Sequence, residues 1–449
     1  MLTELRLENF KSWGDTGRVR LAPLTVFFGR NSSGKSSLLQ SMLLMKQTAE
    51  ALDPREVLNL GGADALVDLG TYYDIVLDHE TSRDVQLTFG WKIPDSAALG
   101  GALFNPLVSD NLSFTTSVGL ESADVLLKEI IVKRMEYRIG TDNGPTVGMR
   151  HVEGRVYRLT TDGITSPHRS TNVLSAPIKC FAFPDVAFKA FPDGVILPEL
   201  SHQFDELMTS ISYVGPLRSR PSRSYQWRGT RPSSVGPSGE NTVAALLARS
   251  VRSSINVASA TYSDFHSMIG FWLKQMGVID EFEIVEIAPG ANLYELRVRA
   301  PAGTTSVPII DVGFGVSQVL PVLVQAFYAE PLSTVILEQP EIHLHPAAQS
   351  VLGDALLSAV IDNDVQLLVE THSEHLLHRI QRRIAEQGIS KDDVALYFID
   401  TKNGRSEIHE LKVDEYGNIT NWPQDFFGDE MGDLAAMTEA AAARRNRHS

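Results

Sequence analysis

The sequence predicts an α/β protein built around a phosphate-binding loop, with an antiparallel β-rich and helical lobe inserted into the chain. Three observations predict this fold class. A short apolar strand, a glycine-rich loop and an apolar-striped helix follow one another near the start of the chain. Two buried strands in the last third of the chain are each followed by an acidic residue. Between these parts lie short strands with alternating apolar and polar residues, which are typical of a meander.

The glycine-rich loop has the spacing G-x-x-x-x-G-K-S, which is the pattern of a phosphate-binding loop. Its glycines let successive N–H groups point at phosphates, and the N-terminus of the following helix adds partial positive charge. We expect Lys35 to reach the β- and γ-phosphates and Ser36 to hold Mg²⁺. An ordinary turn between strand and helix is the alternative, but the apolar flanks favour nucleotide binding. The residues expected to bind are Gly29, Arg30, Asn31, Ser32, Ser33, Gly34, Lys35, Ser36 and Ser37.

The composition limits the classes of protein to which the chain can belong. Its 449 residues, 43% of them apolar, are enough for a large core and two lobes. The single cysteine, Cys180, excludes a disulfide framework and a cysteine-based zinc site. No apolar run approaches the about 18 residues of a membrane span, and no signal peptide is evident, so we expect a cytoplasmic protein. The net charge of −15 argues against a generally basic nucleic-acid coat, but leaves a local basic groove open.

Residues 1–80 are expected to form the first half of the nucleotide-binding head. Strands are predicted at Leu2–Phe10 and Leu24–Phe28, because both runs are apolar or alternate. The helix after the phosphate-binding loop should continue to about Leu52. Leu66–Leu77 is predicted to be a loop and an edge strand.

Residues 81–304 are expected to form the inserted lobe. It begins with the antiparallel meander, whose strands are predicted at Val85–Ile93, Leu112–Val118, Ile130–Ile139 and Arg155–Thr160. Helices are predicted around Leu197–Ser210, Asn241–Arg252 and Ser263–Met276. No heptad repeat is present, so long coiled-coil arms are not expected.

A long irregular loop, rich in Arg, Pro and Gly, runs from Tyr213 to Glu240 between the first two of these helices. Such loops in compact proteins are usually functional or lack a fixed structure. Its arginines could contact the phosphates of a nucleotide or a nucleic acid, or they could pair with surface carboxylates. The sequence leaves both interpretations open for Arg218, Arg220, Arg223, Arg228 and Arg231.

Residues 305–431 are expected to complete the head, and residues 432–449 to form a polar tail that frays. The apolar run Val335–Leu337 fits a buried parallel strand, and Glu338 follows it at once. A second such strand is predicted at Gln366–Val369. Acids that follow these strands would lie where α/β sheets bind their ligands.

Four motifs together are similar to those of one known family. They are Asn9-Phe-Lys-Ser12, the phosphate-binding loop, Glu338-Gln-Pro-Glu-Ile-His-Leu-His-Pro346 and Thr371-His-Ser373. The chain resembles an ABC-type P-loop ATPase head of the RecF/SMC-like branch of AAA-family ATPases, which includes the overcoming-lysogenization-defect (OLD) family. The resemblance implies ATP and Mg²⁺ as cofactors and ATP hydrolysis as the activity. It also implies an ATP-dependent homodimer or a higher even oligomer.

The same resemblance implies roles for single residues. Glu338 takes the position of the Walker B acid, which contacts Mg²⁺ directly or through water. His372 takes the position of the switch histidine, which senses the γ-phosphate. The signature loop of the family caps the nucleotide of a facing subunit through backbone N–H groups. It falls at Gly313, Gly315, Ser317 and Gln318, in an order that departs from the usual Ser-Gly-Gly-Gln.

Two histidine-containing segments have alternative interpretations. His372 could be an ordinary core histidine, but its position after a buried strand that shares a site with the phosphate-binding loop favours sensing. Glu341, His343 and His345 could form a metal cluster. Because His-x-His outside a helix is weak evidence for zinc, a loop at the dimer interface is the preferred interpretation.

Gln339 is the informative departure from the family. The resemblance places a catalytic glutamate here, which orients and activates the attacking water. Glutamine can position water through its carbonyl oxygen but cannot accept the proton. Either hydrolysis is slow, or Glu341, Glu370 or His372 substitutes as the polarising group. We expect weak but real ATPase activity, with Lys35, Glu338, Gln339 and His372 as the catalytic set.

The function implied is an ATP-gated dimeric clamp or regulator, in DNA maintenance or in defence against phage. One alternative is a non-hydrolysing, ATP-dependent scaffold that recruits an effector such as a nuclease. The other is a DNA-binding module with ATP as a structural cofactor. OLD-family nucleases carry a nuclease domain after the ATPase head, and the residues that follow His372 are too few for one. A nuclease activity would therefore come from a separate partner chain.

Overall fold

The structure is a computed structural model of the full chain. It describes residues 1–62, 65–93, 109–121, 129–163, 174–190, 196–249, 255–257, 260–262 and 264–423. The tail predicted at residues 432–449 lies outside the described residues.

A six-stranded sheet forms the centre of the molecule, in the order β10-β17-β18-β4-β19-β20. The first five strands pair in parallel and β20 pairs antiparallel to β19. Every residue of β17 and β18 is buried, as expected for parallel strands covered on both faces. The strands are β10 (Ser212–Val214), β17 (Thr334–Glu338), β18 (Gln366–Glu370), β4 (Leu24–Gly29), β19 (Val394–Lys402) and β20 (Arg405–Glu410).

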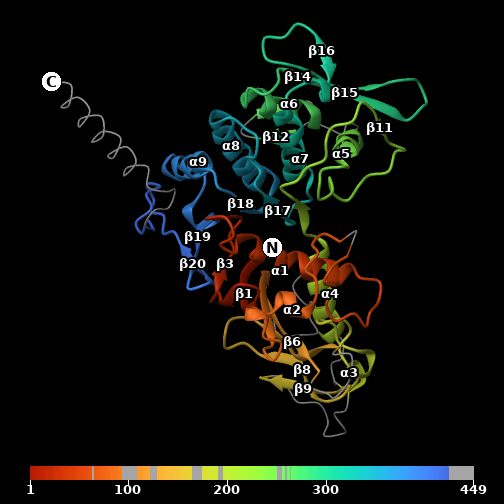
Figure 1. The fold of residues 1–449 in the computed structure, drawn as a ribbon, viewed down its shortest axis with the longest axis vertical. Coiled ribbons are helices and arrows are strands. Elements are labelled where there is room, and N and C mark those ends of the chain that lie inside the picture. Colours follow the sequence, from red (N-terminus) through yellow and green to blue (C-terminus); the bar gives the residue numbers. More distant parts are fainter. Residues whose placement is uncertain are drawn as a thin grey trace, which may run out of the picture.

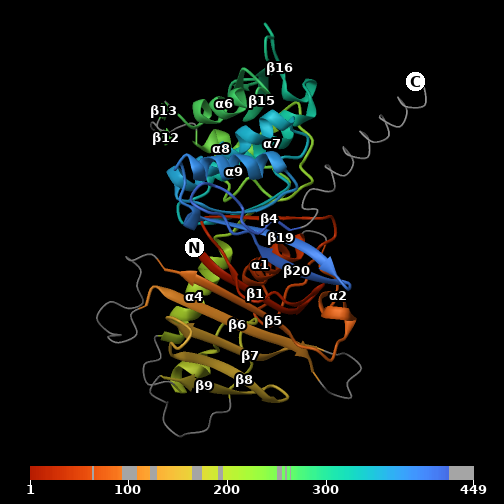
Figure 2. The same cartoon turned by 90° about the vertical axis from the view of Figure 1, so that its left-hand side faces the viewer.

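Helices cover both faces of this sheet (Figure 2). Helix α1 (Lys35–Glu50) packs on one face. The other face carries α5 (Thr242–Arg249), α6 (Phe265–Gln275), α7 (Phe314–Tyr328), α8 (Pro346–Asn363) and α9 (Glu374–Ala385). Alternation along β4 explains the two cores, because Phe27 contributes to the α1 side, whereas Val26 and Phe28 contribute to the other.

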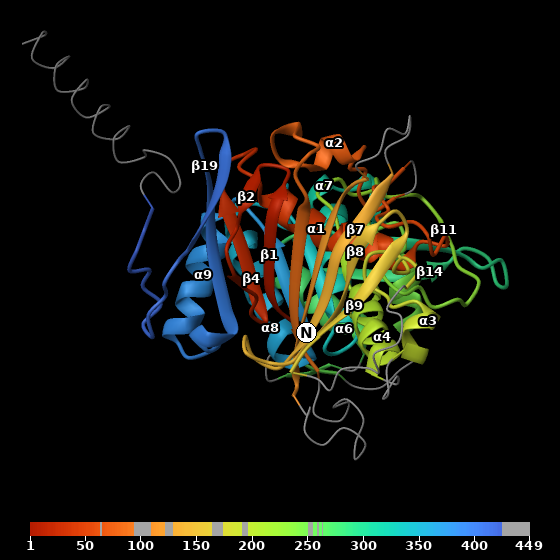
Figure 3. The ribbon, with the colours of Figure 1, turned by 90° about the horizontal axis from the view of Figure 1, so that it is seen from below.

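The antiparallel meander forms a second sheet with the N-terminal strand, in the order β2-β1-β5-β6-β7-β8-β9 with β3 beside β1. Helix α1 is buried between the two sheets, which lie on either side of it in Figure 2. Figure 3 shows the meander from below. The domain boundary predicted between residues 80 and 81 therefore falls within one sheet, because β1 precedes it and β5 follows it. Its strands are β1 (Leu2–Phe10), β2 (Trp13–Asp15), β3 (Val19–Arg20), β5 (Val85–Lys92), β6 (Asn111–Leu120), β7 (Ile130–Ile139), β8 (Thr146–Glu153) and β9 (Val156–Asp162).

Two further helices, a small sheet and a hairpin lie outside the two large sheets and their covering helices (Figure 1). Helix α4 (Ile196–Thr209) packs against α1, and α3 (Asp185–Ala190) precedes it. A small antiparallel sheet combines β11 (Tyr225–Gln226), β14 (Glu281–Glu286), β15 (Leu293–Arg299) and β16 (Ser306–Pro308), and a hairpin joins β12 (Ile255–Val257) and β13 (Ala260–Tyr262). Among the described residues, no helix has the length and apolar character needed to cross a membrane.

The α/β fold class with its β-rich insertion is confirmed, but one local expectation fails and several strands were not predicted. The edge strand predicted within Leu66–Leu77 is wrong, because α2 (Tyr72–Ile75) forms there. Its start is stabilised by Asp74, whose carboxylate accepts the backbone N–H of Thr71 at 2.8 Å. Strand β8 was not predicted, and its burial does not alternate, because its first four residues are all buried. Strand β10 was not predicted either, because its three residues are too few to show an alternation of apolar and polar residues.

Candidate nucleotide-binding site

The glycine-rich loop lies between β4 and α1 and forms one wall of a cavity of about 350 Å³. From the P-loop, Asn31, Ser32, Ser33, Gly34, Lys35, Ser36 and Ser37 line this cavity. Gly29 and Arg30 contribute backbone carbonyls just beneath it. Ser33 Oγ is buried and has no hydrogen-bond partner among the described residues. The loop therefore offers a polar concave surface at the N-terminus of a helix, which suits an anion.

The two glycines of the loop are required by close contacts as well as by backbone conformation. Gly29 has a φ of 147°, and a Cβ there would lie 2.1 Å from the carbonyl oxygen of Ile399. Gly34 has a φ of 102°, and a Cβ there would lie 2.3 Å from Ser406 Oγ and 3.0 Å from Ser12 Oγ. Side-chain-bearing residues rarely adopt these conformations. The loop consequently depends on glycine at both positions.

Lys35 is almost fully buried at the base of the cavity. Its Nζ donates to the carbonyl oxygens of Gly29 at 3.0 Å and Arg30 at 2.6 Å. It also lies 4.0 Å from a carboxylate oxygen of Glu370. Burial lowers the pKa of Lys35, and the charge of Glu370 opposes that shift. The ammonium group is thus held near the loop by partners that a phosphate could replace.

Glu370 is the carboxylate that meets the P-loop. Ser36 Oγ donates to Glu370 Oε1 at 3.1 Å, and Glu370 lines the cavity. Glu338, which the sequence predicts to share a metal with Ser36, does not line it. The reason is the strand order: β18 lies between β17 and β4, so the end of β18 is the nearer one to the loop. Instead, Glu338 Oε1 accepts a hydrogen bond from the Tyr213 hydroxyl at 3.1 Å.

Gln339 and His372 both line the cavity, together with the P-loop residues. Gln339 has a left-handed backbone with a φ of 44°, and its N–H donates to the carbonyl oxygen of Glu370 at 2.7 Å. Burial and then the charge of Lys35 lower the pKa of His372. A neutral imidazole at physiological pH is the consequence.

Three carboxylates are buried at this edge of the sheet. Burial, reinforced by the charge of Glu370, raises the pKa of Glu338 to about 7. Burial likewise raises the pKa of Glu341 and of Glu370. Among the described residues, Glu341 Oε2 and Glu370 Oε2 lack hydrogen-bond partners. The site therefore disfavours the ionised forms of these carboxylates, and a bound cation would stabilise them.

Tyr213 and Arg218 belong to the site, although the sequence did not assign them to it. Arg218 was predicted only as a candidate phosphate contact. Its Nη2 instead donates to the backbone carbonyls of Glu338 at 2.8 Å and Gln339 at 3.2 Å. Ser12 and Gln40 also line the cavity without having been predicted. The Asn9–Ser12 motif was the available signal for Ser12, whereas nothing in the sequence pattern indicates the contacts of Arg218.

The four residues expected in the signature loop lie at the start of α7 and do not line this cavity. Gly313 is exposed and Gly315 is partly exposed, whereas Ser317 and Gln318 are buried. Ser317 Oγ donates to the carbonyl oxygen of Phe314 at 2.8 Å. Of these four residues, Gly313 and Gly315 are therefore the ones whose backbone is accessible to another molecule.

The alternative of a metal cluster in the segment after Gln339 is not supported. Glu341 Oε1 accepts the backbone N–H of His372 at 2.9 Å. The ring of His343 packs edge-on against Phe314, and His345 Nδ1 accepts the N–H of Ala347 at the start of α8. Within the described ranges, no group of three or more potential metal-ligating His, Cys, Asp or Glu side chains exists.

Two further arginines of the long loop pair with acids. Arg223 forms a two-pronged ion pair with Asp311, at 2.9 and 3.1 Å. Arg231 pairs with Glu330 and hydrogen-bonds the Tyr328 hydroxyl. Arg220 lines a separate cavity of about 450 Å³ beside α7. For Arg223 and Arg231, the interpretation as paired surface arginines holds.

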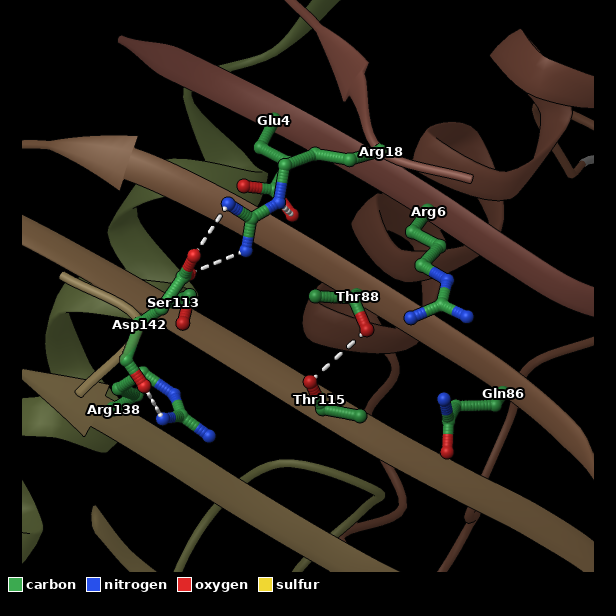
Figure 4. A pocket seen from close by; sticks show the side chains of 9 residues that line it. All are labelled: Glu4, Arg6, Arg18, Gln86, Thr88, Ser113, Thr115, Arg138 and Asp142. Carbon is green, nitrogen blue, oxygen red and sulfur yellow. Dashed lines mark hydrogen bonds and ion pairs between the residues drawn. The ribbon is translucent and has the colours of Figure 1, made fainter. Parts of the chain in front are cut away.

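A second polar cavity, of about 330 Å³, lies on the outer face of the meander (Figure 4). Its arginines already have acidic partners. Arg6 pairs with Asp15, and Arg18 pairs with Asp142 and with Glu4. Arg138 hydrogen-bonds the backbone of Asp142 and lies 3.5 Å from Glu136. The described contacts of these arginines are therefore those of paired surface charges.

A phosphate-binding loop at the carboxyl edge of a parallel sheet, facing acids on neighbouring strands, defines a P-loop nucleotide-binding protein. The chain belongs to the family described as AAA ATPase domain, whose model matches residues 1–135 and 249–377. Residues 389–437 match a second model, described as a protein of unknown function (DUF3696). No curated protein sequence matches the chain.

Three solved structures of SMC heads are similar to this chain at low identity. The SMC head bound to the C-winged helix domain of ScpA is 12% identical, with 92% of this chain and 98% of that chain covered and a TM-score of 0.46. The SMC head domain from Thermotoga maritima is 12% identical, with 92% and 99% covered and a TM-score of 0.41. An SMC head with an extended coiled coil, bound to the C-terminal domain of ScpA derived from Pyrococcus furiosus, is 9% identical, with 92% and 96% covered and a TM-score of 0.41.

Proposed function

We propose that this chain is a slow ATPase that works as an ATP-gated dimer. The observation that carries the proposal is Gln339 on the wall of the P-loop cavity, beside Glu370 and His372. An amide at this position can orient a water molecule but cannot take its proton. Since phosphoryl transfer depends mainly on positioning and charge stabilisation, turnover is reduced rather than abolished.

The residues at the cavity suit a Mg²⁺ ion. Ser36 Oγ and the Glu370 carboxylate are in contact, and Glu370 Oε2 has no partner among the described residues. Hard cations prefer hydroxyl and carboxylate oxygens of this kind. Ser36 and Glu370 would hold the ion, with Glu338 behind them. An ion held by these residues would supply positive charge to balance the negative charge that develops on the phosphates.

A dimer is supported by the accessible surface near the start of α7. The backbone at Gly313 and Gly315 is available to another molecule, but it does not serve the cavity of its own chain. Exposed apolar side chains occur in the same segment, since Phe314 is 46% exposed and Ile310 39%. A facing subunit that completes each site would cover such residues.

The setting we propose, DNA maintenance or defence against phage, rests on the family resemblance alone. The rival function is a non-hydrolysing, ATP-dependent scaffold that recruits an effector, and the same Gln339 favours it. A DNA-binding module has less support, because Arg223 and Arg231 are engaged with carboxylates.

ATP turnover, measured together with mass in solution with and without ATP, tests the proposal. We would compare the native chain with Lys35→Ala and Gln339→Glu. The slow clamp requires ATP to double the mass, slow native turnover, and faster turnover in Gln339→Glu. Tight binding with no turnover in either the native chain or Gln339→Glu would support the scaffold instead. Brisk native turnover that Gln339→Glu leaves unchanged would contradict the role of Gln339.

A further inference from the structure

The segment after β10 crosses the end of β17. Strand β10 pairs with β17 through Val214 and Leu337, so the chain leaves the sheet beside Glu338. Arg218 follows within this crossing and is only 6% exposed. Its Nη2 bridges the carbonyl oxygens of Glu338 and Gln339, at 2.8 and 3.2 Å. A single guanidinium nitrogen thus holds two successive peptide groups at the edge of the nucleotide cavity.

The Gln339 peptide group has an unfavourable backbone conformation that other contacts must stabilise. Gln339 has a φ of 44°, in the left-handed region that side-chain-bearing residues populate sparsely. Its N–H is bonded to the carbonyl oxygen of Glu370, and its own carbonyl is bonded to Arg218. The same carbonyl also accepts the N–H of Ile342 at 3.2 Å, so Arg218 adds a long-range bond to a peptide group that lies in a local turn. Gln339 is also one of the residues that line the cavity.

We propose that Arg218 is a positioning residue, which clamps the backbone of Gln339 and so aims its amide at the nucleotide. The proposal rests on the function proposed above, since the aim of Gln339 affects turnover only if the chain hydrolyses ATP. Arg218 does not line the cavity and would not touch the nucleotide itself. It acts only through Gln339 and the end of β17.

Two of the nitrogen donors of Arg218 are not used by the backbone of Glu338 or Gln339. Its Nε and Nη1 are buried and have no hydrogen-bond partner among the described residues, and the same is true of Glu341 Oε2. Burial lowers the pKa of Arg218, and Glu341 is the carboxylate that opposes this shift most, although no ion pair joins the two in the described structure. Buried donors of this kind are costly to leave unpaired. In Arg218, these unpaired donors belong to the same guanidinium group whose Nη2 binds the Gln339 carbonyl.

Hydrogen exchange and kinetics together test the clamp. Arg218→Met keeps the length and apolar bulk of the side chain but removes every donor. We expect amide exchange in the peptide covering residues 338–343 to rise about tenfold or more, because the Gln339 N–H is freed when its backbone relaxes. Exchange in the P-loop peptide should not change. We also expect kcat to fall about 10- to 100-fold, with the Kd for ATP within about threefold of native.

Arg218→Lys and Arg228→Ala complete the design. A lysine ammonium can reach one carbonyl but lacks the planar fork of arginine, so intermediate exchange and kcat are expected. Arg228 is exposed on the same loop, so Arg228→Ala should behave like the native chain. If Arg218→Met fails to fold, Arg218→Lys decides: intermediate values support the clamp and native values overturn it.

The clamp and the ATPase can fail separately. A folded Arg218→Met protein with native kcat would overturn the clamp, whatever its exchange rates. If the native chain binds ATP without turnover, the ATPase proposal fails while exchange still tests the clamp. In that case, native exchange at residues 338–343 in Arg218→Met overturns the clamp, and faster exchange confined to that peptide supports it.

Discussion

Ser36 of the P-loop donates a hydrogen bond to the carboxylate of Glu370, at 3.1 Å. This contact joins the start of α1 to the end of β18, two parts of the chain that lie far apart in the sequence. It makes Glu370, and not Glu338, the acid closest to the phosphate-binding loop. The contact also brings Lys35 within 4.0 Å of the same carboxylate, so that one acid faces both functional residues of the loop.

The first prediction concerns this acid. Glu370→Gln should weaken ATP binding in the presence of Mg²⁺ about tenfold or more, because the amide is a poor ligand for a hard cation. Without Mg²⁺ the affinity should be unchanged or slightly higher, since a negative charge near the phosphates is removed. Titration of a fluorescent ATP analogue with and without Mg²⁺ measures both. Glu386→Gln, on the surface beyond α9, is the control, and an equal loss under both conditions would contradict the assignment.

The second prediction is a dependence of stability on pH. Burial, with the charge of Glu370, raises the pKa of Glu338 from its ordinary 4.5 to about 7 in the folded protein. Between these values the folded chain binds more protons than the unfolded chain, so the contribution of Glu338 to the free energy of unfolding is present below about pH 4.5. This contribution, on the order of 3 kcal/mol, is lost as the pH rises through about 7.

Denaturant unfolding of the native chain and of Glu338→Gln, without Mg²⁺ or nucleotide, measures this contribution from pH 5 to about pH 8. The stability of native protein relative to the variant should fall as pH rises. Mg²⁺ should stabilise the native chain more at about pH 8 than at about pH 5.5, because protons compete for the carboxylates. A difference between the two proteins that does not vary with pH would disprove the shift.

The third prediction concerns the backbone of the P-loop. Gly34→Ala adds a Cβ that would lie 2.3 Å from Ser406 Oγ, at a φ of 102°. We expect a loss of about 1–3 kcal/mol in the free energy of unfolding and a loss of ATP binding, because the loop must shift. Gly62→Ala is the matched control, since no atom lies within 4 Å of that Cβ. ATP binding at native affinity in Gly34→Ala would show that the loop tolerates the side chain.

The fourth prediction tests whether two chains share each site. Gly313→Glu should fold normally, since no atom lies within 4 Å of its Cβ, but its carboxylate would repel the phosphates of a facing subunit. Lys35→Ala should be inactive because its own P-loop is damaged. A mixture of the two inactive proteins should regain about a quarter of the native turnover, since half of the dimers are mixed and each has one intact site. If mixing restores nothing, the Gly313 loop does not serve a partner's site.

Local patterns account for the parts of the fold that could be predicted. The P-loop, the helix after it and strands β17 and β18 are each defined by a short run of residues whose apolar spacing or glycine positions allow one structure. Strand β10 and the helix at Tyr72–Ile75 could not be found in this way. Strand β10 has three residues, and the helix is held by a capping contact and by packing rather than by an apolar stripe.

The sequence by itself determined the fold class and the presence of a nucleotide-binding loop, because both are encoded in contiguous residues. Only the tertiary structure decided which acid meets Ser36, since that follows from β18 lying between β17 and β4. It also decided that the meander continues the sheet of β1, and that Arg218 binds the backbone of Gln339. Such contacts join segments remote in sequence, and strand order and loop path, rather than residue spacing, determine them.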